Sequence, residues 1–294
     1  MFKIECVVKS RSQLGEGAMW DMRTGQLWWV DISAGLIHCF DPKSKVNKVH
    51  EFGEPVGCLA LRESGGLIVA AKSGFYFFDP ITETKDLLVD PEVDRPGNRF
   101  NDGTTDMQGR FWAGTMKDGG DPEPTGRFYR LDPNLSCRPW LENIYTTNGL
   151  AFSGDGKTMY FSDSHPKVRT IWTCDYDTDT GTPSNRRVFY DTRTLRGRPD
   201  GGTVDADGCY WMAGVGGWHV VRFTPDGRVD LEIDMPVEKP TKPMFGGAGL
   251  DELYVTSIGA GTLETPDPEQ PDAGGLFVIT GLGITGVPQA RFRG

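Results

Sequence analysis

The sequence predicts an all-β protein built as a six-bladed β-propeller, and three observations support this prediction. A short apolar phrase recurs six times along the 294 residues, at intervals of 40, 44, 48, 51 and 43 residues. This is the spacing expected of four-stranded propeller blades. Each phrase is followed, after a glycine or a short polar stretch, by a second strand-like phrase. The chain also contains 39 Gly and 20 Pro, which suit many short strands joined by turns.

The six recurring phrases are expected to be one strand of each blade. They are LWWVDI (27–32), LIVAAK (67–72), FWAGTM (111–116), MYFSDS (159–164), YWMAGV (210–215) and LYVTSI (253–258). The strands that follow them begin at Gly35, Gly74, Gly126, Thr170, His219 and Gly275. The strands that precede them are expected to line the central channel, and they open at Glu16, Val56, Asn101, Asn148, Asp200 and Pro243. No composition break separates the repeats, so we expect one domain over residues 1–294.

Charge and composition exclude several classes of function. The net charge of −10 argues against a nucleic-acid or anionic-membrane partner, since both require a basic face. No stretch is long and apolar enough to span a bilayer, and the first eight residues do not resemble a signal peptide. The six cysteines include no C-x-x-C pair, so we expect reduced thiols and a cytoplasmic location, with an extracellular disulfide set as the alternative. No feature of the sequence predicts an oligomeric state.

Four of the six expected inner strands open with a carboxylate or a carboxamide: Glu16, Asn101, Asn148 and Asp200. Because inner strands all line the channel, these side chains are expected to meet at one mouth of it. Oxygen ligands of this kind suit Ca²⁺, Mg²⁺ or Mn²⁺. The alternative is that the Asx-Gly pairs are ordinary turns. Their place at the opening of inner strands, rather than at hairpins within a blade, favours the metal site.

Several longer motifs resemble those of the gluconolactonase and senescence-marker-protein (regucalcin) family of sugar lactonases. They follow one another over nearly the whole chain: LGEGAMWD (14–21), RFNDGTTDMQGRFWAGTM (99–116), TNGLAFSGDGKTMYFSDS (147–164), SNRRVF (184–189), RPDGGTVDADGCYW (198–211), FGG (245–247) and AGGLFVITGLGITG (273–286). The resemblance implies a six-bladed propeller that hydrolyses a sugar lactone with one divalent metal in its channel. We therefore expect one divalent cation, Ca²⁺, Zn²⁺, Mn²⁺ or Mg²⁺.

The resemblance also implies roles for individual residues. The metal ligands fall on Glu16 of the LGEG motif, Asn148 of the TNGL motif and Asp200 of the RPDG motif. A carboxylate at the edge of the metal can hold a water against the lactone carbonyl, so we expect Asp200 to be the general base as well. The cation is expected to stabilise the negative charge that develops on the carbonyl oxygen.

Substrate contacts implied by the resemblance fall on Arg99 and Asn101 of the RFNDG motif, with Asp102 alongside. The arginine fork and the amide group would bind sugar hydroxyls. A further acidic contact that many vertebrate-like members carry falls on Gly119, so the chain departs from the family there and we expect a different, shorter lid.

Two other functions stay open from the sequence. One is a non-catalytic, metal-binding propeller that acts as an interaction or regulatory module. The other is a permissive esterase or phosphotriesterase. The substrate itself could carry a carboxylate, sulfonate or phosphate if one of Arg193, Arg196 and Arg198 turns towards the channel mouth. The alternative for these arginines is that they are solvated loop charges.

Overall fold

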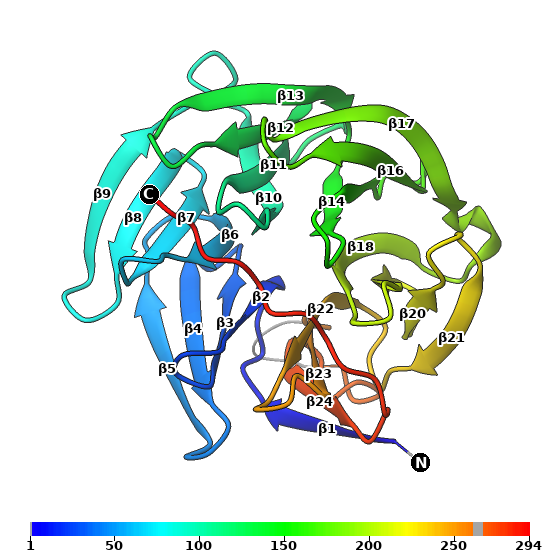
Figure 1. Ribbon diagram of the computed structural model, residues 1–294. Coiled ribbons are helices and arrows are strands. Elements are labelled where there is room, and N and C mark those ends of the chain that lie inside the picture. The colour runs from blue at the N-terminus through cyan, green and yellow to red at the C-terminus, as the bar shows by residue number, and fades with distance from the viewer. Residues whose placement is uncertain (1, 261–266) are drawn as a thin grey trace.

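The computed structural model describes residues 2–260 and 267–294, and it consists of six four-stranded antiparallel sheets. Figure 1 shows the sheets arranged as blades in a ring about a central axis, along which the innermost strand of each blade runs. The predicted six-bladed β-propeller is confirmed.

The first three blades are each formed by consecutive strands. Blade 1 consists of β2 (Gly15–Asp21), β3 (Gln26–Asp31), β4 (Leu36–Asp41) and β5 (Val46–Glu51). Blade 2 consists of β6 (Val56–Leu61), β7 (Leu67–Ala71), β8 (Gly74–Asp79) and β9 (Thr84–Val89). Blade 3 consists of β10 (Asn98–Thr105), β11 (Phe111–Lys117), β12 (Gly126–Leu131) and β13 (Cys137–Ile144).

Blades 4 and 5 follow the same order, whereas blade 6 includes both ends of the chain. Blade 4 consists of β14 (Thr147–Phe152), β15 (Thr158–Asp163), β16 (Thr170–Asp177) and β17 (Thr182–Asp191). A single 3₁₀ turn, η1 (Thr192–Thr194), leads to blade 5, which consists of β18 (Arg198–Val204), β19 (Tyr210–Val215), β20 (His219–Phe223) and β21 (Val229–Asp234). Blade 6 consists of β22 (Pro240–Gly246), β23 (Glu252–Ser257), β24 (Leu276–Thr280) and β1 (Lys3–Val8).

The six recurring phrases of the sequence form the second strand of every blade, and the phrases after them form the third. The innermost strands also include the expected openings, but three of them begin two or three residues earlier: β10 at Asn98 rather than Asn101, β18 at Arg198 rather than Asp200, and β22 at Pro240 rather than Pro243. The sequence interpretation did not include β1. This strand pairs antiparallel with β24, with Ile4 opposite Ile279, and so closes the ring between the first and last parts of the chain.

Large aromatic side chains fill the interior of the blades. Trp29, Trp112 and Trp211 lie on β3, β11 and β19, and all three are fully buried. Burial of a side chain of this size contributes about 4 to 6 kcal/mol of hydrophobic free energy, before the entropic cost of ordering it. These second strands therefore form a rigid support behind the inner strands.

Every inner strand has an irregularity in its pairing with the second strand of its blade. The register shifts directly after Glu16, Val56, Phe100, Asn148, Pro199 and Pro240. A bulge of this kind leaves residues outside the hydrogen-bonded ladder and redirects their side chains. Gly17 and Gly149 follow two of these points with φ of 64° and 66°, a left-handed conformation that favours glycine. The propeller therefore places six irregular points around one part of the channel.

The segment after β24, red in Figure 1, runs across the middle of the ring from blade 6 towards blade 2. It bonds to blade 6 through Gly286 N and Leu250 O (2.8 Å), and to blade 5 through Ala206 N and Thr285 O (2.8 Å). It then reaches blade 2, where the buried Phe292 donates its backbone N–H to Leu61 O (2.8 Å). These contacts all lie at the far ends of the inner strands. Among the described residues, no helix is long and apolar enough to cross a membrane.

Candidate active site at one mouth of the channel

The structure brings the three predicted metal ligands together near the beginning of the inner strands of blades 1, 4 and 5. Glu16, Asn148 and Asp200 are 4%, 3% and 6% exposed. The carboxyl groups of Glu16 and Asp200 are close enough that the charge of Glu16 contributes to raising the pKa of Asp200. Asn148 is linked to the strand of Asp200 through Ser164, which accepts a hydrogen bond from the Asn148 amide (2.6 Å) and donates one to Pro199 O.

Two aspartates hold the chain just before Glu16 and Asn148. In blade 1, the Asp31 carboxylate accepts hydrogen bonds from the backbone N–H groups of residues 13 and 14 (2.7 and 3.0 Å). In blade 4, the Asp163 carboxylate accepts them from residues 145 and 146 (2.9 and 3.1 Å). Each aspartate ends the second strand of its blade, in the phrases WWVD and YFSD. The repeat therefore uses the same bond in two blades to fix where a site residue enters the channel.

Glu16 and Asp200 form a buried pair of like-charged groups. Burial, followed by the charge of Asp102, raises the pKa of Glu16 above its usual range. Burial, followed by the charge of Glu16, raises the pKa of Asp200 well above its usual range. Two carboxylates held this close in a buried setting are stabilised by a shared proton or by a cation between them.

The donor set fits a hard divalent cation. It offers two carboxylates and one amide oxygen, and oxygen ligands of this type are what Ca²⁺, Mg²⁺ and Mn²⁺ prefer. The Asn148 amide nitrogen donates to Ser164, and its oxygen accepts one hydrogen bond from Asn101, which leaves that oxygen one further lone pair for a cation. None of the described residues donates a hydrogen bond to the Asp200 carboxylate. Across residues 2–260 and 267–294, no group of three or more His, Cys, Asp and Glu side chains is arranged to hold a metal; the predicted set has two carboxylates and one amide.

Asn101 lies beside these ligands with its own amide group fully engaged. Its nitrogen donates to Thr147 O (2.8 Å) and to the Asn148 amide oxygen (3.1 Å). Its oxygen accepts a hydrogen bond from Arg99 (2.8 Å). This arrangement favours the three-ligand set of Glu16, Asn148 and Asp200 over the ring of four that the strand openings suggested.

The Arg99 side chain is 12% exposed and lies at the channel mouth, where Asp118 faces it. The guanidinium nitrogen and the Asp118 carboxylate are 3.4 Å apart, and Asp118 also binds Lys72 (2.7 Å). Gly119, where relatives were expected to carry an acid, is exposed and has φ of 78°. The acidic group of this lid is therefore Asp118, one position earlier. The sequence interpretation noted the changed lid but not this pairing.

Asp102 lies deeper than the predicted substrate contacts. One carboxylate oxygen accepts hydrogen bonds from Lys242 (2.8 Å) and from the backbone of Gly103 (2.9 Å), and the other accepts one from the backbone of Leu150 (2.9 Å). Lys242 is buried as well, and its stem lies against Gly201, where a Cβ would come within 2.4 Å of the lysine side chain. Both oxygens of Asp102 are thus occupied by the protein, and the pair connects blades 3, 4 and 6 behind the ligands.

Sequence reasoning missed Lys242, because the sixth inner strand was expected to begin after it. A signal was present in the repeat. Lys242 is the second residue after Pro240, the last paired residue before the register shift of β22, and Asp102 is the second residue after Phe100, the last paired residue before the shift of β10. An alignment of the six inner strands on their bulges would have placed the two residues at one level of the channel.

The three arginines before Asp200 have different surroundings. Arg193 is bound to Asp191, and Arg196 is bound to Asp234 (2.6 Å). Arg198 is half-buried and makes no hydrogen bond or ion pair within the described part of the chain.

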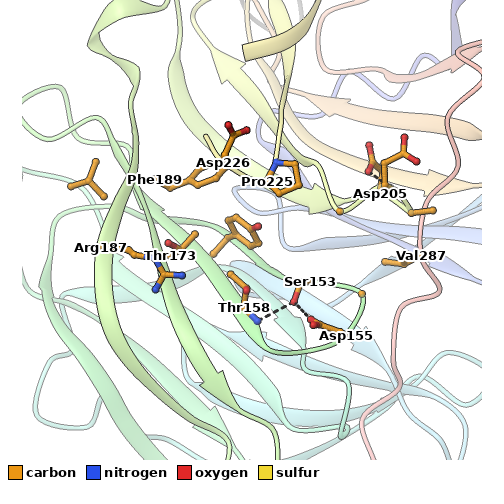
Figure 2. A pocket seen from close by; sticks show the side chains of 16 residues that line it. Ser153, Asp155, Thr158, Thr173, Arg187, Phe189, Asp205, Pro225, Asp226 and Val287 are labelled. Atoms are coloured by element: carbon orange, nitrogen blue, oxygen red, sulfur yellow. Dashed lines mark hydrogen bonds between the residues drawn. The ribbon is translucent and has the colours of Figure 1, made fainter. Parts of the chain in front are cut away.

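A cavity lies on the opposite face of the propeller, between blades 4 and 5 (Figure 2). It has a volume of about 640 Å³, and it includes the labelled side chains of Asp155 and Asp205. Asp155 accepts a hydrogen bond from Ser153 (2.6 Å), and Asp205 accepts hydrogen bonds from Trp211 (2.8 Å) and Arg222 (2.7 Å). Since these carboxylates already have protein partners, this cleft is part of the blade packing rather than a second candidate site.

Comparison with known proteins identifies the family of the chain. Residues 14–259 match the model of the SMP-30/gluconolactonase/LRE-like region. Regucalcin of Xenopus laevis is 37% identical over 298 residues, and 6-deoxy-6-sulfogluconolactonase of Pseudomonas putida is 37% identical over 291 residues; each alignment covers 99% of both chains. The crystal structure of a calcium-binding protein, regucalcin, from Agrobacterium tumefaciens superposes with a TM-score of 0.91 at 29% identity, over 99% of this chain and 98% of that one. The chain therefore belongs to the SMP-30/gluconolactonase/LRE-like family.

Proposed function

We propose that this protein is a hydrolase that opens a sugar lactone to the sugar acid, with one divalent cation held by Glu16, Asn148 and Asp200. The observation that carries the proposal is the meeting of two buried carboxyl groups and one oriented amide oxygen at a single channel mouth. Family membership supports it, because relatives are named for a sugar lactonase and for a calcium-binding regucalcin.

Each part of the site has a task in this reaction. When bound, the cation supplies positive charge that stabilises the oxyanion formed as water adds to the lactone carbonyl. Asp200 accepts the proton of the attacking water, since none of the described residues donates to its carboxylate. Arg99 lies at the mouth with donors that can bind sugar hydroxyls. Asn101, whose amide group is bonded to Arg99 and Asn148, holds both in place and lines the same wall.

Asp102 has a different role in this proposal from the direct substrate contact expected from the sequence. Because its oxygens bind Lys242, Gly103 and Leu150, it acts as a positioning residue for the strand of Asn101 and the strand of Asn148. The carboxylate fixes the ligand geometry from behind, and the substrate binds on the other side of the ligands.

The test is the opening of glucono-1,5-lactone, followed by acid release against the spontaneous rate. The protein is stripped with a chelator and then reloaded separately with Ca²⁺, Mg²⁺, Mn²⁺ and Zn²⁺. Activity should disappear on chelation and return with at least one ion. The substitution Asp200→Asn should lower the rate by at least about 100-fold, as expected for loss of a general base. The matched control, Asp226→Asn, changes an exposed carboxylate of the hairpin after β20 and should leave the rate unchanged.

The other two functions are outcomes of the same experiment. Cation binding without any rate above the spontaneous one would favour the non-catalytic, metal-binding module. Higher catalytic efficiency on a phosphotriester or a simple ester than on any lactone would favour the permissive esterase. The predicted absence of nucleic-acid and membrane partners, and the cytoplasmic location, stay predictions.

A further inference from the structure

Arg198 and Arg99 occupy equivalent positions in two blades. In blade 3, Arg99 pairs with Met116 and the next residue pairs with Thr115 before the register shifts. In blade 5, Arg198 pairs with Val215 and the next residue pairs with Gly214 before the register shifts at the same step. Each arginine also stands two residues before a site residue, Asn101 in blade 3 and Asp200 in blade 5. The propeller therefore presents two arginines at the same height of the channel mouth, on either side of blade 4.

The two arginines differ in their partners. Arg99 donates to Phe100 O (2.9 Å) and to Asn101 (2.8 Å), and it faces the carboxylate of Asp118. Arg198 is half-buried, yet none of its five N–H donors is bonded to a described residue. A guanidinium group in that position is bound by water or by an anion that is not part of the chain.

The surroundings of Arg198 add positive charge rather than remove it. Arg169 is close enough to be repelled by Arg198, and its Nη2 donates only to the backbone carbonyls of residues 192, 195 and 197. The two arginines nearby in the sequence are bound to acids of their own, Arg193 to Asp191 and Arg196 to Asp234. The nearest carboxylate for Arg198 on its own strand is Asp200, which the proposed cation would use. Arg198 therefore has no ion pair among the described residues, and the carboxylate that feels its charge is that of Asp200.

We propose that Arg198 forms an anion-binding subsite, so that the preferred lactone carries a carboxylate, sulfonate or phosphate at the end away from the reacting carbonyl. The planar fork of arginine matches two oxygens of such a group, and charge-assisted bonds of this kind are the strong ones. Arg99 would bind the neutral hydroxyls on one side of the mouth, and Arg198 would bind the anionic substituent on the other. This inference rests on the proposed function, since it identifies the class of lactone that the same site opens.

The experiment compares three substrates that differ only at C6: glucono-1,5-lactone with a hydroxyl, with a sulfonate and with a phosphate. The parent protein should open at least one anionic lactone with a kcat/KM at least about 10-fold above that of the neutral lactone. Arg198→Gln should lower this preference by about 10- to 100-fold, as expected for hydrogen bonds to a charged group, without a comparable loss on the neutral lactone. Arg198→Lys should restore part of it. The sulfonate and phosphate arms identify which oxyanion the subsite prefers.

The matched controls are Arg193→Gln and Arg196→Gln, which remove the two neighbouring charges that are already bound to acids. Neither should change the preference. If the parent and Arg198→Gln prefer the anionic lactone equally, and both still open the neutral lactone, the subsite is contradicted but the proposed lactonase activity is not. If no lactone is opened at all, the proposed function fails, and calorimetry still decides the subsite. In that case 6-phosphogluconate should bind the metal-loaded parent more tightly than gluconate does. Equal affinity of the parent and Arg198→Gln for 6-phosphogluconate would contradict the anion-binding subsite.

Discussion

The ammonium group of Lys242 lies 2.8 Å from a carboxylate oxygen of Asp102, and both side chains are almost completely buried. The two residues come from inner strands β22 and β10, so the ion pair crosses the channel behind the candidate ligands. A buried ion pair adds little net stability, because desolvation offsets the attraction. Removal of one partner destabilises the protein strongly, because the remaining charge is then buried without a counter-charge.

Lys242→Met should therefore destabilise the protein by about 3 to 5 kcal/mol. The free energy of unfolding from urea titration measures this. The double variant Asp102→Asn, Lys242→Met removes both charges and should cost clearly less than the two single changes added together. Strict additivity of the two losses would show that the groups do not interact in solution.

Cation binding should stabilise the protein through the Glu16 and Asp200 carboxyl pair. At a free ion concentration of 100 times the dissociation constant, the expected gain is about 2.7 kcal/mol. For a chain of this length that corresponds to a rise in Tm of about 5 °C. Differential scanning calorimetry with chelator and with added Ca²⁺ or Mn²⁺ measures the shift.

Glu16→Gln should change which protein is more stable, the variant or the parent, depending on whether metal is bound. Without metal, the variant should be at least as stable as the parent, because it removes one member of a buried like-charged pair. With metal, it should be the less stable protein, because a charged ligand is lost. Asp226→Asn serves as the control and should follow the parent in both conditions. A variant that loses stability equally with and without metal would contradict a ligand role for Glu16.

Asp163→Asn should weaken cation binding although Asp163 touches no cation. Its carboxylate holds the backbone of residues 145 and 146 just before Asn148, and an amide group in its place presents an N–H to one of these N–H groups. Unfolding should be easier by about 1 to 3 kcal/mol, and isothermal titration should show a lower affinity for Mn²⁺. Asp175→Asn, on an exposed part of β16, should change neither quantity by a similar amount. Unchanged Mn²⁺ affinity in Asp163→Asn would show that Asn148 is positioned by other contacts.

Acid should destabilise the protein through His38. This histidine is 4% exposed and its ring stacks on Trp29 with centroids 4.6 Å apart. Burial lowers its pKa to about 4, whereas a histidine in the unfolded chain titrates near 6.5. The folded state therefore keeps the ring neutral while the unfolded state binds a proton. Stability should fall as the pH drops from about 6.5 to 4, by about 3 kcal/mol from this residue.

His38→Phe keeps a ring on Trp29 and removes the titrating group. Urea titrations of parent and variant at pH 7 and pH 4.5 measure the difference between them, in which the other acid-sensitive groups cancel. The variant should lose less stability than the parent between the two values. Equal losses would show that His38 is protonated in the folded protein without penalty.

Most of the fold could be predicted because the propeller repeats one local pattern. The phrases with Trp29, Trp112 and Trp211 mark second strands whose apolar runs are legible without any knowledge of distant contacts. The closing strand β1 could not be found in this way. Its pairing joins residues about 270 positions apart, for example Ile4 and Ile279. The local sequence of a six-residue strand with mixed burial does not indicate which distant strand it pairs with.

The candidate site was likewise predictable in part: the repeat indicates which residues meet, but not which partners hold them. Glu16, Asn101, Asn148 and Asp200 all open inner strands, so the architecture predicts that they converge, and the family resemblance selects Glu16, Asn148 and Asp200 as ligands. The partners that hold them depend on side-chain directions at the bulges. Lys242 stands between Thr241 and Pro243, a context that suggests a turn, and only the register of β22 reveals that its chain points towards Asp102.

Residues 285–293 cross the end of the channel opposite the candidate site, so the two ends of the channel differ. Anything joined behind Gly294 would leave the molecule near blade 2, on the side away from Glu16, Asn148 and Asp200. A solid support or fluorescent reporter attached at that point would therefore hold the protein with its reactive opening turned outwards.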